Sequence, residues 1–137
     1  MSSSASGEPE IMGGTETVLV VEDEAPLLKL IHHILENYGY KVLDSPNGKL
    51  ALEVWEQHRA KIDLLLTDLI LPDGMAGPEL AKILQSGKPG LKVIYMSGYD
   101  SDRVAKEFPP GEPFNFVQKP FHARKLAEAV YACLNDK

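Results

Sequence analysis

From Thr17 onward, short apolar runs alternate with longer stretches of helical period, and this alternation is the feature that most restricts the fold. Repeated strand–helix units predict an α/β domain with a parallel sheet. Because parallel crossovers are right-handed, five such units form a doubly wound open sheet with helices on both faces, whereas a barrel needs eight. The predicted strands are Thr17–Val21, Tyr40–Asp44, Ile62–Thr67, Leu91–Met96 and Phe114–Gln118.

Five helices are predicted between and after these strands from apolar periodicity and from helix-stop residues. The first has its apolar face on Leu27, Ile31 and Leu35 and stops at Gly39, where a left-handed residue is suited to end a helix. The others are placed after the turn 45–48, between Pro78 and Gly87, from Ser101 to about Phe108, and from about Ala123 to Leu134.

The chain is predicted to hold one domain, residues 17–137, preceded by a flexible leader or linker, residues 1–16, that is rich in Ser, Gly and acids. Its apolar runs are far shorter than the roughly 20 residues of a membrane span, so no membrane contact and a cytoplasmic location are expected. A net charge of -6 without a basic run argues against direct nucleic-acid binding. The single cysteine, Cys133, excludes an internal disulfide.

Polar side chains stand at the carboxyl ends of four predicted strands. Glu22 and Asp23 follow the first strand, Asp68 the third, Ser97 the fourth and Lys119 the fifth. Because parallel strands end at one edge of the sheet, where ligands bind in open α/β folds, these side chains are expected to meet.

Three carboxylates at one edge need compensation, because each pair repels by about 4 kcal/mol at ~4 Å and an effective dielectric of ~20. Proton sharing with raised pKa values is one solution, and a hard divalent cation with oxygen ligands is the other. Lys119 and the hydroxyl of Ser97 favour the cation, since a transferring phosphoryl group needs charge neutralisation and positioning. Asp68 would then be the nucleophile that forms an acyl phosphate.

Together, the motifs VLVVEDE, LLLTDLILP, VIYMSGY and FVQKPF make the chain resemble the response regulator receiver domain of two-component systems, over residues 17–137. The resemblance implies a flavodoxin-like sheet of order 2-1-3-4-5 with five helices. The segments LPDGMAGPELA, YMSGY and QKPF are most similar to the C-terminal receivers of hybrid sensor histidine kinases. A hybrid histidine kinase is therefore one expected parent, and a stand-alone receiver is the other.

The resemblance also implies roles for individual residues of this chain. Asp68 matches the phosphoryl acceptor, and Glu22 and Asp23 match the acids that bind Mg²⁺. Ile70 matches the position whose backbone carbonyl reaches the metal. The loop between Asp68 and the glycine that opens the third helix is one residue longer than the usual spacing.

Three further matches imply a conformational switch that biases the surface of the fourth helix, fifth strand and fifth helix. Ser97 resembles the hydroxyl that contacts the phosphoryl group, and Lys119, before a Pro120 whose bond is cis in the family, resembles its ammonium partner. Phe116 resembles the switch aromatic and stands where many relatives have Tyr. The implied partner is a histidine kinase or a histidine phosphotransfer domain, and the chain is expected as a monomer or weak homodimer.

Two alternatives remain open. An aspartate-nucleophile phosphohydrolase would need a second acid two residues after Asp68, where this chain has Ile70. An interaction module that has lost phosphorylation would lack the Asp or the Lys, and neither is missing. As an isolated domain the chain is not expected to be an enzyme beyond Mg²⁺-dependent self-phosphorylation and slow autodephosphorylation. All four histidines are expected on the surface: His32, His33, His58 and His122.

Overall fold

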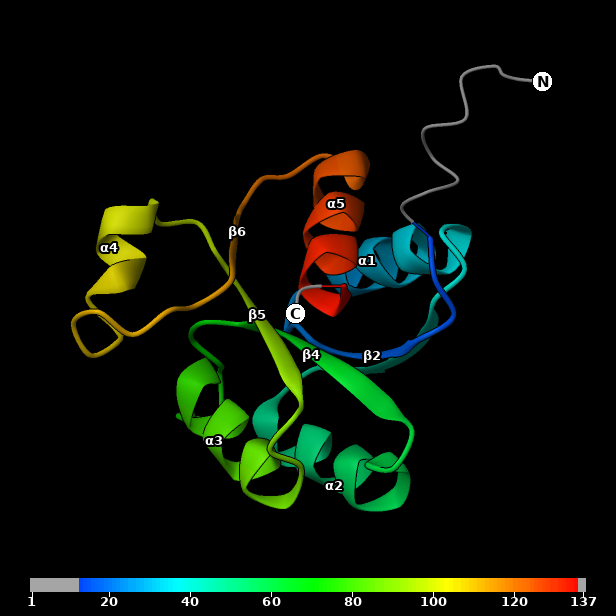
Figure 1. Ribbon diagram of the computed structural model, residues 1–137, viewed down its shortest axis with the longest axis horizontal. Helices are drawn as coiled ribbons and strands as arrows, with labels where there is room; N and C mark the ends of the chain where they lie inside the picture. The colour runs from blue at the N-terminus through cyan, green and yellow to red at the C-terminus, as the bar shows by residue number, and fades with distance from the viewer. Residues whose placement is uncertain (1–12, 136–137) are drawn as a thin grey trace.

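A parallel five-stranded sheet organises residues 13–135, which are the residues described by the computed structural model (Figure 1). Its strands run in the order β3-β2-β4-β5-β6, which is the 2-1-3-4-5 order expected from the family resemblance, so that expectation is confirmed. The strands are β2 (Thr17–Val21), β3 (Lys41–Ser45), β4 (Ile62–Asp68), β5 (Lys92–Ser97) and β6 (Phe116–Gln118).

Five helices cover the two faces of the sheet. Figure 1 shows α1 and α5 together on one side, and α2 and α3 on the other. The connection from β2 to β3 runs in one direction across the sheet, and the later connections run in the opposite direction. Because each crossover is right-handed, the two directions place their helices on opposite faces. The helices are α1 (Ala25–Asn37), α2 (Gly48–His58), α3 (Gly77–Gly87), α4 (Ser101–Ala105) and α5 (Ala123–Leu134).

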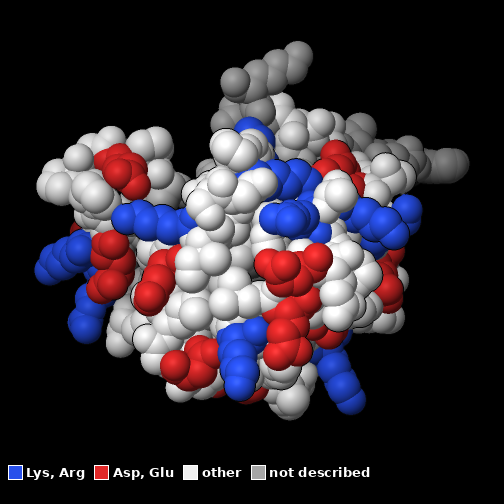
Figure 2. Space-filling model, turned by 90° about the horizontal axis from the view of Figure 1, so that it is seen from below, with Lys and Arg blue, Asp and Glu red and all other residues white. Residues whose placement is uncertain are grey.

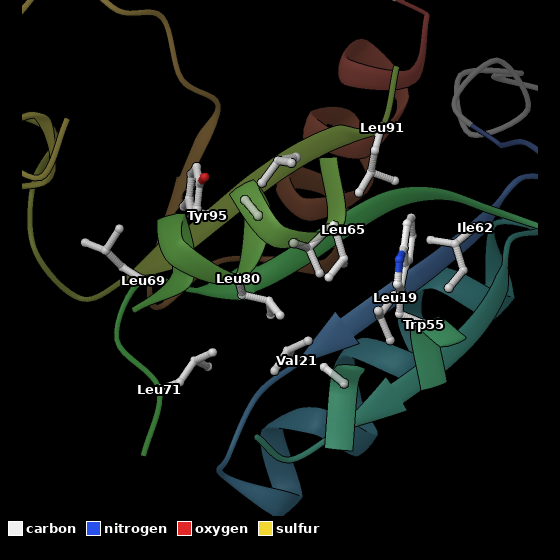
Figure 3. Close-up of a cluster of buried hydrophobic side chains, with 14 of the residues drawn as sticks. Leu19, Val21, Trp55, Ile62, Leu65, Leu69, Leu71, Leu80, Leu91 and Tyr95 are labelled. Atoms are coloured by element: carbon white, nitrogen blue, oxygen red, sulfur yellow. The ribbon is translucent and has the colours of Figure 1, made fainter. Parts of the chain in front are cut away.

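Alternating side chains of the central strands supply two hydrophobic clusters. On β4, Leu65 packs into the cluster that contains Trp55 of α2 and Leu80 of α3 (Figure 3). Its neighbours Leu64 and Leu66 point to the opposite cluster, which α1 and α5 complete. Each such fully buried leucine contributes about 1.5–3 kcal/mol relative to an exposed one. The sheet is therefore buried on both faces, as a parallel sheet requires.

Several predicted boundaries were displaced by one or two residues, and one helix is shorter than predicted. The fourth helix ends at Ala105, whereas the periodicity suggested about Phe108. Its Asp100 cap accepts from the backbone N–H of Arg103 at 2.9 Å, and Val104 is its buried residue. Pro109 disfavours a helical conformation at Phe108, whose ring instead stacks on Phe114 at a centroid distance of 4.5 Å. Phe114 lies outside β6, which begins at Phe116, whereas the sequence predicted a strand from Phe114.

The predicted leader, residues 1–16, falls mostly outside the described residues. Of its last four residues, Gly14 donates its backbone N–H to the carbonyl of Tyr38 at 3.1 Å. The carbonyl of Glu16 accepts from the backbone N–H of Lys41 at 2.9 Å. These bonds attach the segment before β2 to the turn that leads into β3. The boundary between leader and domain stays a prediction.

Acidic and basic side chains are interspersed over the face shown in Figure 2, and no broad patch of one sign covers that face. Within residues 13–135, no helix combines the length and the apolar character needed to cross a membrane.

Candidate functional site

The strand ends of the sheet form a pocket of about 260 Å³ beside the predicted phosphoryl acceptor. The pocket lies over the carboxyl ends of β4, β5 and β6, as expected for an open parallel sheet. The four strands β2, β4, β5 and β6 are consecutive neighbours, so residues up to 97 positions apart meet here. The lining residues are Asp23, Asp68, Leu69, Ile70, Met96, Ser97, Gly98, Tyr99 and Lys119.

Lys119 connects two of the three acids. Its Nζ lies 2.6 Å from Oδ1 of Asp68 and 2.6 Å from Oε1 of Glu22. Its backbone N–H donates to the carbonyl of Ser97 at 2.7 Å, which fixes the start of the side chain beside the end of β5. The peptide bond between Lys119 and Pro120 is cis. One ammonium thus compensates two carboxylates in a poorly solvated position.

The three acids differ in exposure. Glu22 is 1% exposed and Asp68 is 6% exposed, whereas Asp23 is open to solvent. The second oxygen of Glu22, Oε2, accepts from the backbone N–H of Glu24 at 3.0 Å. Both oxygens of Glu22 therefore have protein partners, and Asp68 and Asp23 face the pocket.

Burial raises the pKa of Asp68 to about 7. The ammonium of Lys119 opposes this rise by stabilising the charged form, and the negative charge of Glu22 adds to it. Burial lowers the pKa of Lys119, but its bonds to Asp68 and Glu22 outweigh burial, so the net direction is upward. Lys119 therefore keeps its charge, while Asp68 is a carboxylate that gains from additional positive charge.

The acidic cluster has the composition of a site for a hard divalent cation. Oxygens of Glu22, Asp23 and Asp68 all lie within 4.8 Å of one another. Mg²⁺ and Ca²⁺ prefer such oxygen ligands, and the repulsion among three acids favours a bound cation. Ile70 lines the same pocket with its side chain 64% exposed. Glu22, Asp23 and Asp68 can therefore hold a metal between them.

Ser97 and Phe116 occupy different surroundings. Ser97 lines the pocket, and its Oγ accepts from the backbone N–H of Tyr99 at 3.0 Å. Phe116 pairs with Tyr95 across β5 and β6 and packs against the core cluster on the α2 and α3 side. Phe116 is outside the set of residues that line the acidic pocket. Both roles assigned to them by resemblance stay predictions.

Tyr99 and Asp73 had no role in the sequence analysis. Tyr99 lines the pocket and is 43% exposed, and the guanidinium carbon of Arg103 lies 4.3 Å from the centre of its ring. Asp73 binds the start of α2 from the loop after β4. The pocket position of Tyr99 could have been predicted, because it follows Ser97 by two residues and the residues after a strand end lie at the same edge of the sheet. No comparable pattern in the sequence indicated the contact of Asp73 with α2.

A doubly wound parallel sheet with an acid cluster, a lysine and a serine at its strand ends defines a receiver-type signalling domain. The sequence model of the response regulator receiver domain matches residues 18–131, and the chain belongs to this family. It is a phosphoacceptor signalling domain of two-component systems.

Relatives of known sequence include both kinases and response regulators. The chain is 35% identical over 126 residues to the sensor kinase CckA of Brucella abortus, covering 92% of this chain and 13% of that protein. It is 29% identical over 113 residues to the response regulator receiver protein CpdR of the same organism, covering 82% of this chain and 92% of that protein. The chain thus spans a small part of the kinase and nearly all of the receiver protein.

Solved structures give the same result. The receiver domain of the hybrid histidine kinase CckA has a TM-score of 0.72 at 32% identity, covering 87% of this chain and 99% of that one. A response regulator receiver protein from Sinorhizobium medicae WSM419 has a TM-score of 0.77 at 28% identity, covering 89% and 96%. The similarity to receivers of hybrid kinases expected from the motifs is therefore confirmed.

Proposed function

We propose that Asp68 accepts a phosphoryl group from a phosphohistidine of a histidine kinase or a histidine phosphotransfer domain, with Mg²⁺ as cofactor. The observation that carries this proposal is the position of Asp68: a buried strand-end carboxylate, 2.6 Å from the Lys119 ammonium, that faces an open pocket. We assign this function to residues 17–137. The similarity to a sensor kinase supports a histidine kinase as the donor.

The transfer is a displacement at phosphorus. An oxygen of Asp68 attacks, the bond from phosphorus to the donor imidazole nitrogen breaks, and that nitrogen keeps the electron pair and takes up a proton. Lys119 neutralises charge that develops on the phosphoryl oxygens, because its ammonium already stands beside the attacking carboxylate.

The metal would be held by Glu22, Asp23, Asp68 and the backbone carbonyl of Ile70. When bound, Mg²⁺ supplies positive charge to the phosphoryl oxygens and lowers the repulsion among the acids. The carboxylates of Asp23 and Asp68 face the pocket, which leaves them available as ligands. Since Glu22 also accepts hydrogen bonds from Lys119 and from the backbone N–H of Glu24, it would in addition hold the Lys119 ammonium in place.

Phosphorylation would switch the surface of α4, β6 and α5. The hydroxyl of Ser97 would turn from the N–H of Tyr99 toward the phosphoryl group, and the ring of Phe116 would follow into the vacated space. Because Ile70 offers an apolar side chain two residues after the nucleophile, no general base stands there to activate water. We therefore expect slow autodephosphorylation. We also propose a cytoplasmic location, and a monomer or weak homodimer.

Acetyl phosphate with MgCl2 provides a direct test, read out by intact-protein mass. The wild-type chain should gain one phosphoryl group, and the adduct should disappear in Asp68→Asn and in samples with excess chelator. Asp63→Asn is a matched control, because Asp63 lies on the same strand outside the pocket. An adduct that survives in Asp68→Asn would contradict the assignment.

A further inference from the structure

We propose that Asp73 is a positioning residue for the metal site, because it fixes the tip of the loop that carries Ile70 to the first turn of α2. This inference rests on the proposed function and adds a residue that lies outside the pocket. The loop between β4 and α3 comprises residues 69–76; its first residues line the pocket, and its tip reaches a different helix.

The contact at the loop tip is a hydrogen bond between distant parts of the chain. Oδ2 of Asp73 accepts from the backbone N–H of Lys49 at 2.9 Å, across 24 positions of sequence. The approach is close because Gly48 has no side chain: a Cβ there would lie 3.0 Å from the sulfur of Met75 and 3.5 Å from the carboxylate oxygens of Asp73. The N–H of Lys49 also holds the pKa of Asp73 below its usual value, so the carboxylate stays ionised.

The anchor on α2 is held by contacts that do not involve Asp73. Asn47 already caps this helix, since its Oδ1 accepts from the backbone N–H of Leu50 at 2.8 Å. Ala51 and Trp55 bury the inner face of α2 in the core. The bond from Asp73 therefore serves the loop more than the helix, because the helix end has a local cap and a packed face.

The loop can transmit the position of its tip to Ile70. The backbone N–H of Leu71 donates to the carbonyl of Met75 at 3.2 Å, and Ile70 and Ala76 form an antiparallel bridge. The N–H of Gly77 donates to the carbonyl of Leu69 at 2.7 Å. These bonds make the loop a small hairpin, so a displaced tip tilts the strand segment that holds Ile70.

The buried side chains of Leu69 and Leu71 fix only the base of this hairpin. They alternate with Ile70, which points outward and lines the pocket. Rotation about this base stays possible unless the tip is held, and Asp73 holds it. With the tip held, the Ile70 carbonyl keeps its position beside the acids, and we expect a higher affinity for Mg²⁺ than in a chain that lacks the Asp73 contact.

The test is a titration of the whole chain with MgCl2, monitored by amide chemical shifts, in wild type, Asp73→Ala, Asp73→Asn and Glu56→Ala. Asp73→Ala should weaken the affinity for Mg²⁺ about threefold, below the roughly tenfold loss typical when a direct outer-shell partner of a ligand is removed. Asp73→Asn loses the charge but keeps an oxygen acceptor, so its affinity should stay within about twofold of wild type. Glu56→Ala removes an exposed carboxylate from the same helix without touching its first turn or the loop, and its affinity should equal that of wild type.

A metal-free measurement accompanies the titration. Hydrogen exchange at the Lys49 amide should become faster in Asp73→Ala and remain slow in Asp73→Asn. Wild-type Mg²⁺ affinity in Asp73→Ala would overturn this inference alone. A loss in Asp73→Asn as large as in Asp73→Ala would also overturn it, because charge rather than position would then be the cause. A wild-type chain that binds no Mg²⁺ would overturn the proposed function and, with it, the role of Asp73.

Discussion

The ammonium of Lys119 lies 2.6 Å from Oδ1 of Asp68, and the same ammonium lies 2.6 Å from Oε1 of Glu22. This arrangement joins the ends of β2 and β4 to the residue that follows β6. Two nearly buried carboxylates share one cation, so the site is strained electrostatically until further positive charge arrives. A divalent metal ion would supply that positive charge.

Replacing Lys119 by Met should destabilise the fold, because Glu22 and Asp68 would then be buried without their shared cation. We expect a loss of roughly 2 kcal/mol in the free energy of unfolding at pH 7 without metal, less than for a fully buried pair because the lysine is partly exposed. Urea denaturation measures this value. Lys125→Met, on the exposed side of α5, is the control and should change stability little. Equal stability of the two variants would show that Lys119 does not compensate these acids.

Asp68→Asn should stabilise the metal-free protein above pH 7. The pKa of Asp68 is raised to about 7 in the folded state, so the protonated carboxyl favours the folded protein. This contribution to stability is complete below pH 3.8 and is lost as the pH rises through 7. Asn does not titrate, and at pH 8 the variant should be more stable by about 2 kcal/mol. Thermal or urea unfolding at pH 5 and pH 8 measures the difference, which should shrink at pH 5. A variant that is less stable than wild type at pH 8 would refute the raised pKa.

Gly77→Ala should disturb the end of β4, the strand that carries Asp68. A Cβ at Gly77 would collide with the carbonyl oxygen of Asp68 and lie 3.2 Å from the backbone of Leu69. The expected loss of stability is about 1–3 kcal/mol, the usual cost of an overpacked site, and phosphorylation should slow because the Asp68 backbone is displaced. Gly90→Ala is the control, since nothing lies within 4 Å of a Cβ there. Two variants of equal stability and equal phosphorylation rate would contradict this packing.

His32 should make stability depend on pH near neutrality. Partial burial lowers its pKa, but the bonds of its ring to Asp44 at 2.7 Å and to Glu36 at 3.0 Å outweigh burial and raise it above 6.5. The stabilisation is therefore complete below pH 6.5 and is lost as the pH rises through the folded-state pKa. We expect His32→Gln to lose about 0.5 kcal/mol at pH 6 and almost nothing at pH 9. His33→Gln, an exposed neighbour, should behave like wild type, and an NMR titration that places the pKa of His32 below 6.5 would disprove the effect.

Much of the fold could be predicted because each strand had its own local signal. Val18–Val21 and Leu64–Leu66 are apolar runs too short for helices, and the stretches between strands had helical period. Gly39 ends α1 with φ +97, as its position suggested. The meeting of Asp68 with Lys119 could be predicted for a different reason: parallel strands end at one edge whatever their separation in sequence.

The remaining contacts depend on distances that no local pattern encodes. His32 was expected on the surface, and its side chain is 31% exposed, but its bond to Asp44 of β3 joins residues twelve positions apart and has no local signal. The bond from Asp73 to Lys49 depends on the conformation of an irregular loop. The end of α4 was predicted too late although Pro109 disfavours a helix at Phe108, and the stack of Phe108 on Phe114 is a tertiary contact. None of these contacts could be predicted from a local sequence pattern, because each joins residues that only the folded chain brings together.

The most direct test of the account is to locate the phosphoryl group. The chain is phosphorylated with acetyl phosphate and MgCl2, reduced with borohydride to convert an acyl phosphate into an alcohol, digested and mapped by tandem mass spectrometry. The account predicts homoserine at residue 68 in the peptide that contains LLLTDLILP, and in no other peptide. A modification at Asp23, at Glu22 or on a histidine, with Asp68 unchanged, would contradict it.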